Sequence, residues 1–285
     1  MRKLLTLAAG LVAGLALMAT PAGAVTGNFE KDFVHQYVGL IVFYDADGEF
    51  MWRCSGSLIA PTVFLTAGHC TDQNAAESPV SARVWFRQDA GAEFNGVIDP
   101  DTGYPETCIT NDAGRVDDVC VTSHKLYDYG FDNFAGFPNH RDVGIAILDT
   151  PVTTLGFGQL PAPNLLTTLA ANTKKNDIWL TSSGYGVSRV VPGLVSFRER
   201  LMVDSYIVNL HNSLTDGFNI QSTANPGGGK GGTCFGDSGG PVLLRGTNTI
   251  LSVTSFGLNP NCKGLDFSYR IDRPEVLAWI ASHSS

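Results

Sequence analysis

Basic residues are scarce in this 285-residue chain, where 19 Lys and Arg stand against 27 Asp and Glu for a formal charge of −8. Binding to nucleic acid requires a basic surface, so this balance argues against DNA or RNA as a partner. Apolar runs long enough to span a bilayer are missing beyond the first 24 residues. No C-x-x-C pair occurs, which removes the usual sequence mark of a zinc site.

The first 24 residues have the form of a secretory signal peptide. Met1-Arg2-Lys3 is a short basic head, Leu4 to Ala19 is an apolar run, and Ala22-Gly23-Ala24 is a small-residue cleavage site. A membrane anchor is the alternative, but the run is short and carries glycines. We therefore expect cleavage after Ala24, a secreted protein and no membrane attachment. Loss of two basic residues would bring the net charge to about −10.

Many short strands joined by turns are expected from a chain with 32 glycines, 14 prolines and only 16% charged residues. The chain is long enough for two modest cores or one large one. Val276, Leu277 and Ile280 recur at helical spacing, which predicts a closing helix from Pro274 to Ala281. Strands are predicted at Tyr37 to Tyr44, Glu49 to Ile59, Thr62 to Thr66, Ala82 to Arg87, Val116 to His124, Asp142 to Leu148, Asp177 to Gly184, Phe197 to Val208, Pro241 to Leu244, Ile250 to Phe256 and Asp266 to Arg270.

A glycine-flanked turn, Gly236-Asp237-Ser238-Gly239-Gly240-Pro241, is the most informative stretch. A serine hydroxyl attacks a carbonyl only when a base takes its proton and hydrogen-bond donors receive the oxyanion. Glycine leaves the backbone N–H groups of Gly236 and Ser238 free to face the reacting centre. An ordinary turn would carry this hexapeptide by chance with a probability of about 10⁻⁴. The stretch therefore predicts a nucleophile.

A base and an acid to orient it precede this turn. Thr66-Ala67-Gly68-His69-Cys70 ends an apolar strand, so His69 leaves a strand end beside a cysteine that can fix it. Asp142 stands directly before an apolar run, where a carboxylate is unusual without a partner. The order along the chain is His69, Asp142, Ser238. The remaining histidines lack such contexts and are predicted to be surface or loop residues: His35, His124, His140, His211 and His283.

In these motifs and their order, the chain resembles the chymotrypsin/trypsin family of serine endopeptidases, as a secreted, bacterial-type member. The resemblance covers almost the whole mature chain. It implies an all-β fold of two six-stranded antiparallel β-barrels, with the active site in the cleft between them and a short C-terminal helix. The implied division is a signal peptide at 1–24, an N-terminal barrel at 25–150, a crossing at 151–172, and a C-terminal barrel with the helix at 173–285.

The resemblance also implies the chemistry. Ser238 attacks a peptide carbonyl, His69 transfers the proton to the leaving amine, and Asp142 orients the imidazole. The N–H groups of Gly236 and Ser238 form the oxyanion hole. Ser255 either supports the aspartate or is an ordinary serine on a half-buried strand. A protein or peptide substrate, a monomeric enzyme, and no cofactor or metal are expected. The implied substrate pocket contains Gly232, Thr233, Phe235, Ser255, Phe256, Gly257 and Asp266.

The residue preferred at the cleaved bond stays open. Trypsin-like members carry an aspartate six residues before the nucleophile, where this chain has Gly232. Asp266 falls on the strand that forms the neighbouring pocket wall, where an otherwise apolar surround would make it select Lys or Arg. If Asp266 faces solvent instead, large apolar residues are favoured.

Six cysteines in an exported chain indicate three disulfides, for which the sequence allows fifteen pairings. The resemblance selects Cys54 with Cys70 and Cys234 with Cys262, which leaves Cys108 with Cys120. These last two lie between His69 and Asp142, in a stretch longer than in compact family members. Zinc is the competing account of clustered Cys and His, and the export signal favours disulfides.

Cleavage after Ala24 would expose Val25-Thr26-Gly27-Asn28 as a new N-terminus. In the family such a terminus inserts its amine beside the aspartate that precedes the nucleophile, here Asp237, and so forms the oxyanion hole. Signal peptidase would then generate the active form without a separate propeptide. The alternative is a frayed Val25, with Asp237 only capping the turn.

Two other functions stay open. An inactive protease-like fold can serve as a secreted binding module, although this chain keeps all three triad residues and the oxyanion-hole glycine. An esterase could use the same triad on other acyl groups. The chain order and the implied disulfides favour the endopeptidase.

Overall fold

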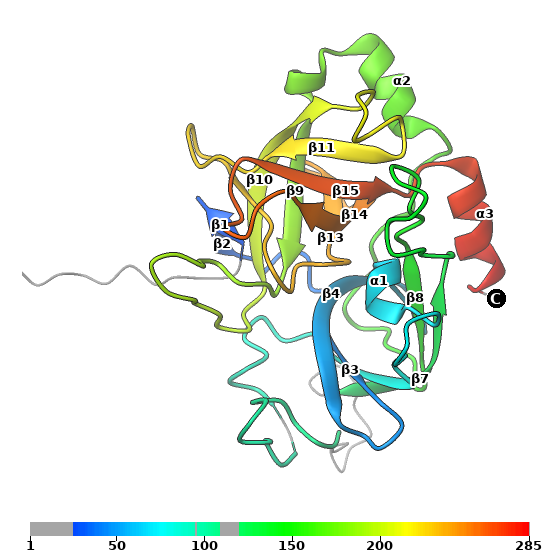
Figure 1. The fold of residues 1–285 in the computed structure, drawn as a ribbon, viewed down its shortest axis with the longest axis vertical. Helices are drawn as coiled ribbons and strands as arrows, with labels where there is room; N and C mark the ends of the chain where they lie inside the picture. Colours follow the sequence, from blue (N-terminus) through cyan, green and yellow to red (C-terminus); the bar gives the residue numbers. More distant parts are fainter. Residues whose placement is uncertain (1–24, 95, 109–119, 285) are drawn as a thin grey trace, which may run out of the picture.

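A computed structural model describes residues 25–94, 96–108 and 120–284 (Figure 1). The predicted signal peptide at 1–24 and the first part of the strand predicted at Val116 to His124 lie outside the described residues. Within the described part, no helix has the length and apolar character needed to cross a membrane.

Six antiparallel strands close the first barrel. Around the ring they are β3 (Val38–Tyr44), β4 (Phe50–Ala60), β5 (Val63–Thr66), β8 (Gly144–Leu148), β7 (Val121–Asp128) and β6 (Ser81–Trp85). The large apolar side chains of β3, β5 and β6 fill its core, among them Phe43, Phe64 and Trp85. Since every strand has two neighbours, the barrel leaves no open edge.

The second barrel has the same construction. Its ring is formed by β9 (Trp179–Gly184), β10 (Leu201–Asn209), β11 (Asn219–Thr223), β15 (Leu265–Arg270), β14 (Ile250–Gly257) and β13 (Pro241–Leu244), and the pairing of β10 with β11 closes it. β1 (Thr26–Gly27) pairs with β12 (Gly231–Gly232), and β2 (Glu30–Lys31) pairs with β10. The first described residues of the chain are thus attached to the second barrel. The division of the chain at residue 150 stays a prediction.

Within the described residues, three α-helices accompany the strands. α1 (Gly68–Thr71) follows β5, α2 (Leu165–Asn172) lies in the crossing between the barrels, and α3 (Pro274–Ser282) closes the chain with proline in its first turn. A short 3₁₀ turn, η1 (Lys175–Asp177), precedes β9. The predicted class, two antiparallel barrels with a C-terminal helix, is confirmed.

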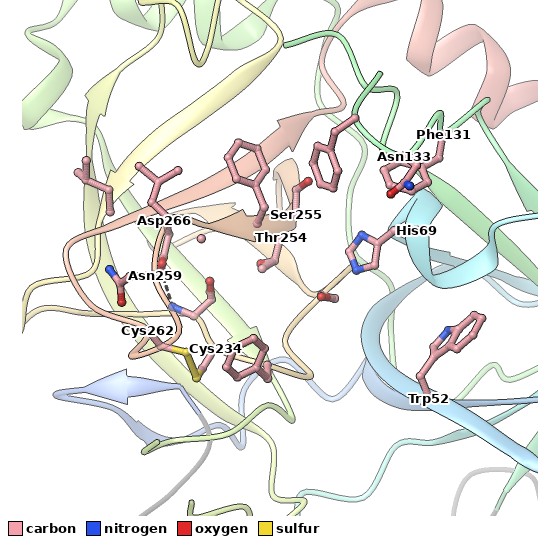
Figure 2. Close-up of a pocket in the computed structure, with 18 of the residues that line it drawn as sticks. Trp52, His69, Phe131, Asn133, Cys234, Thr254, Ser255, Asn259, Cys262 and Asp266 are labelled. Carbon is pink, nitrogen blue, oxygen red and sulfur yellow. Dashed lines mark hydrogen bonds between the residues drawn. A yellow bond between two sulfur atoms is a disulfide. The ribbon is translucent and has the colours of Figure 1, made fainter. Parts of the chain in front are cut away.

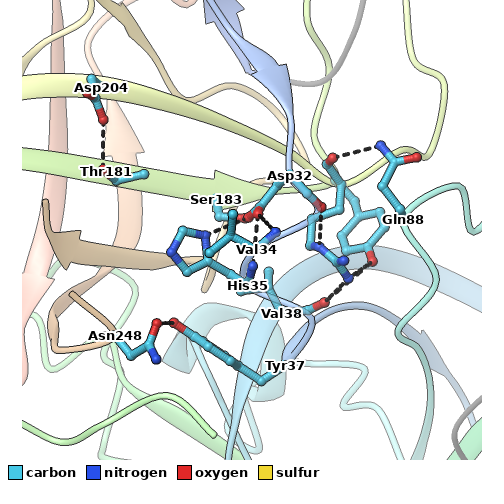
Figure 3. Close-up of polar contacts among 12 residues, drawn as sticks. Asp32, Val34, His35, Tyr37, Val38, Gln88, Thr181, Ser183, Asp204 and Asn248 are labelled. Carbon is cyan, nitrogen blue, oxygen red and sulfur yellow. Dashed lines mark hydrogen bonds and ion pairs between the residues drawn. The ribbon is translucent and has the colours of Figure 1, made fainter. Parts of the chain in front are cut away.

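A buried polar cluster ties the start of the chain to both barrels (Figure 3). The fully buried Asp32 carboxylate accepts hydrogen bonds from His35 Nδ1 (2.9 Å) and Ser183 Oγ (2.6 Å). Arg200 donates to the carbonyl oxygens of Asp32 (3.1 Å) and Val38 (3.1 Å). Burial alone would raise the pKa of Asp32, but its contacts with His35 lower it to about 2. His35 lies in a loop as predicted, yet it is buried and paired.

Candidate active site

The serine-bearing turn is held by hydrogen bonds from the first barrel. Gly236 and Gly239 have φ values of +94° and +77°, in the region that glycine adopts without strain. Ser55, on β4, donates its N–H to Ser238 O (2.8 Å) and its hydroxyl to Gly236 O (2.8 Å). A turn that belongs to the second barrel by sequence is therefore positioned by a residue of the first.

Two backbone N–H groups are available beside Ser238. The N–H of Val187 donates to Phe235 O at 2.7 Å. Because C=O and N–H point in opposite directions across a trans peptide, this bond turns the N–H of Gly236 away from Val187. Neither that N–H nor the N–H of Ser238 donates a hydrogen bond to another described residue. Together they form the candidate oxyanion hole.

His69 and Asp142 form a hydrogen-bonded pair. His69 lies in α1, at the end of β5, and Asp142 lies just before β8, the strand that pairs with β5. The buried Asp142 carboxylate accepts from the backbone N–H of His69 (2.8 Å) and from its Nδ1 (2.9 Å). Burial opposes both charges, but Asp142 raises the pKa of His69 above 6.5, and His69 lowers the pKa of Asp142 below 3.8.

One cavity of about 480 Å³ contains the candidate nucleophile and base (Figure 2). Both Ser238 and His69 line it. In Figure 2, His69 and Trp52 lie at one end, and Asp266 lies at the other. No direct hydrogen bond joins Ser238 to His69 among the bonds of the described residues. Contacts of this kind often tighten only when substrate binds.

Six of the seven predicted pocket residues line this cavity, and Gly232 does not: Thr233, Phe235, Ser255, Phe256, Gly257 and Asp266 do so. Gly232 is buried behind the wall, where a side chain would meet Ala224 and the Asp266 carboxylate. Asp266 is only 7% exposed and accepts a hydrogen bond from the N–H of Thr233 at 2.5 Å. Burial raises its pKa to about 7.

The start of the described chain is packed against β10 and pairs with β12, the strand that precedes the serine turn. Val25 is fully buried against side chains of β10, and the following Thr26 pairs with β12. Asp237 is buried beneath the turn and accepts from the N–H groups of Gly186 (2.8 Å) and Cys234 (2.9 Å). Burial raises its pKa to about 7. The pairing of a Val25 amine with Asp237 stays a prediction.

All three predicted disulfides are present: Cys54–Cys70, Cys108–Cys120 and Cys234–Cys262. The first ties β4 to the helix that carries His69, and the third joins the segment before the serine turn to the loop between β14 and β15. Cys54, His69 and Cys70 lie close enough together for a metal site. Their two sulfurs are already joined to each other, so the cluster supplies no thiolate ligands.

His140, expected only to be a surface or loop residue, lies beside the candidate triad in the structure. It lies in a loop, as predicted, but is fully buried. Its Nε2 is 3.0 Å from Ser255 Oγ, and the Ser255 hydroxyl also donates to Asp142. Its position two residues before Asp142 is the sequence signal that points to it.

Two closed barrels, with a buried His–Asp pair and a glycine-flanked serine at one cavity, have the architecture of chymotrypsin-like serine proteases. The trypsin family model matches residues 196–280 of this chain. Trypsin zeta of Drosophila erecta is 26% identical over 276 residues, which cover 90% of this chain and 86% of that protein. These matches support a trypsin-family domain in this chain. The fruit-fly relative gives no support to the expected bacterial type.

Solved structures share the fold at low identity. A structure of HL collagenase aligns with a TM-score of 0.64 at 20% identity, covering 91% of this chain and 98% of the other. A scabies mite inactivated protease paralogue aligns with a TM-score of 0.61 at 14% identity, covering 90% and 97%. The fold is therefore shared by a protein named as a collagenase and by one named as an inactivated protease paralogue, so activity has to be judged from the residues of the site.

Proposed function

We propose that this protein is a secreted serine endopeptidase that cleaves peptide bonds through an acyl-enzyme on Ser238. The observation that carries the proposal is the hydrogen-bonded pair of His69 and Asp142 at the cavity that also contains Ser238. The backbone N–H groups of Gly236 and Ser238, which donate to no other described residue, would supply the oxyanion hole that this chemistry also needs. The trypsin family match and the fruit-fly relative agree with it.

The proposed mechanism gives each of these residues one step. Since Nδ1 of His69 donates to Asp142, the lone pair of the neutral ring is on Nε2, which accepts the Ser238 proton. Ser238 Oγ forms a bond to the carbonyl carbon, and the N–H groups of Gly236 and Ser238 stabilise the negative oxygen. His69 then gives the proton to the amine nitrogen as the C–N bond breaks, which leaves the acyl group on Ser238. A water molecule that gives a proton to His69 attacks the acyl carbon, the bond to Ser238 Oγ breaks as that oxygen regains the proton, and the acid is released.

Asp266 favours Lys or Arg as the residue before the cleaved bond. Its carboxylate is buried, lines the cavity and accepts hydrogen bonds from Thr233, which is a neutral residue. A substrate cation would supply the opposite charge that an ionised carboxylate needs there. Large apolar residues would leave that carboxylate unpaired.

Peptide cleavage by wild type and Ser238→Ala tests the function. We expect the substitution to lower kcat by about 10⁶, while Ser282→Ala, an exposed serine on α3, leaves it unchanged. Matched amide and ester substrates distinguish the endopeptidase from an esterase, which would turn over only the ester. Equal, background-level hydrolysis by wild type and Ser238→Ala would favour the binding module.

N-terminal sequencing of the secreted protein tests the processing step. We expect Val25 as the first residue, since it is already buried beside the segment that leads to the serine turn. A start elsewhere would contradict activation by signal peptidase alone.

A further inference from the structure

Ser255 lies between two hydrogen-bond acceptors. Its Oγ contacts Asp142 Oδ2 on one side and is 3.0 Å from His140 Nε2 on the other. The hydroxyl has a single proton, so it can donate to only one of these acceptors at a time. How that proton is shared depends on the state of His140.

The surroundings of His140 define its tautomer. Nδ1 is 3.1 Å from the carbonyl oxygen of Pro138, which can only accept, so Nδ1 carries the ring proton. Burial lowers the pKa of His140 below 6.5, although Asp142 opposes this. At neutral pH the ring is therefore neutral, and Nε2 presents a lone pair to Ser255.

The cage around this ring is mainly aromatic. Phe134, Phe137, Phe256 and Tyr269 have ring centroids 4.8 to 5.8 Å from that of His140. The titratable groups that act on it are Asp132 and Asp142, which favour its cation, and His69, which opposes it. The strand β15 contributes Tyr269 to the surroundings of His140. The phenol of Tyr269 donates a hydrogen bond to Asn139, and burial raises its pKa.

We propose, building on the protease function above, that His140 is a positioning residue that competes with Asp142 for the Ser255 proton and thereby makes His69 a stronger base. When the Ser255 O–H points toward Asp142, the positive end of its dipole offsets part of the carboxylate charge. When the O–H points toward His140, an oxygen lone pair faces Asp142 instead. The second orientation stabilises the His69 cation.

Replacing His140 by Phe removes the competing acceptor and keeps a ring in the aromatic cage. The Pro138 carbonyl keeps a hydrogen bond from Asn219 Nδ2 at 2.9 Å, so the substitution leaves it paired. The Ser255 proton then belongs to Asp142 alone. We expect the acid limb of the kcat/KM profile to shift to lower pH, with little change at alkaline pH, where His69 is neutral in both proteins.

The Ser255→Ala background separates this effect from a packing defect. Without the hydroxyl, the hydrogen-bond path from His140 to Asp142 is lost, and a neutral His140 ring adds no charge of its own, so His140→Phe should no longer move the acid limb. Ser255→Ala alone should move it to higher pH, opposite to His140→Phe. Tyr269→Phe is the matched control, because it alters the same aromatic cage without contacting Ser255, and its profile should match wild type.

Histidine NMR on the Ser238→Ala protein gives a readout that does not depend on activity. With ¹⁵N-labelled histidine, we expect Nε2 of His140 to be unprotonated at neutral pH, and His69 to titrate at lower pH when His140→Phe is added. If wild type proves inactive while these shifts occur, the protease proposal fails and the proton competition stands. Two outcomes would overturn the proton competition. One is a ring proton on Nε2 of His140. The other is a His140→Phe substitution that does not shift the His69 titration, or that shifts it equally in the Ser255→Ala background.

Discussion

Gly232 and Asp266 are direct neighbours, although only Asp266 lines the cavity: a Cβ on Gly232 would lie 2.5 Å from Asp266 Oδ2. The carboxylate thus fills space that a side chain at Gly232 would need. An acid contributed by the strand β15 stands where the resemblance placed an acid six residues before the nucleophile.

The Asp266→Asn variant should lose its preference for basic residues. The amide keeps the shape but not the charge, so the charge-assisted contact with Lys or Arg is lost. We expect kcat/KM for Lys and Arg peptides to fall by about 10²-fold, and that for Phe peptides to change much less. Cleavage of matched peptides measures both. An equal fall for all peptides would show that Asp266 has a structural role only.

The preference for a basic residue should also depend on pH. Burial raises the pKa of Asp266 to about 7 from an ordinary 3.8, so in the free protein this carboxyl is mostly neutral below pH 7 and mostly ionised above it. The ratio of kcat/KM for Lys over Phe peptides should therefore increase by about tenfold per unit as pH rises toward 7, then level off. Titration of His69 affects both substrates and cancels in the ratio. A flat ratio would contradict pairing of the substrate with Asp266.

Two disulfides of similar span should differ in their effect on catalysis. Replacing either Cys54 and Cys70 or Cys108 and Cys120 by alanine should lower the free energy of unfolding by about 3 kcal/mol, measured by denaturant titration. Only the first pair is bonded to the helix that carries His69. We expect a fall in kcat for that pair alone. A similar fall for the second pair would mean that its loop reaches the site.

The ionised Asp32 carboxylate should increase the free energy of unfolding at pH values above its pKa. Its pKa is lowered from 3.8 to about 2, so its contribution is complete above pH 3.8 and is lost as pH falls through about 2. The shift corresponds to about 2 kcal/mol. Asp32→Asn should therefore unfold more easily at pH 6, and the gap to wild type should narrow at pH 2. Denaturant titrations at both pH values measure it, and a constant gap would contradict this account.

The parts of the candidate site that could be predicted from the sequence are those in which neighbouring residues form one short motif. Ser238 and His69 could be predicted because the neighbouring residues in the sequence, glycines around the serine and an apolar strand before the histidine, already indicate their roles. Asp266 could not be assigned, because its direction depends on the register of β15 against its neighbours. His140 was missed because its partner, Ser255, is far away in sequence and meets it only in the folded chain.

The fold was predictable where apolar residues mark the strands. β11 escaped prediction because its buried side chains include Asn219, Gln221 and Thr223, which give no apolar alternation. The burial of this polar strand is decided by its pairing with β15 and β10, which is a tertiary effect. α2 was missed in the crossing because it is short and buries few of its side chains.

Ser55 makes the geometry of the serine turn depend on how the two barrels are packed together. Since this residue of the first barrel holds two carbonyls of the serine turn, a small separation of the barrels would deform the oxyanion hole before either core unfolds. On the proposed function, activity would therefore depend on how the two barrels are held together. A chain that had folded only one barrel would contain the triad residues but would lack the contact that positions the serine turn.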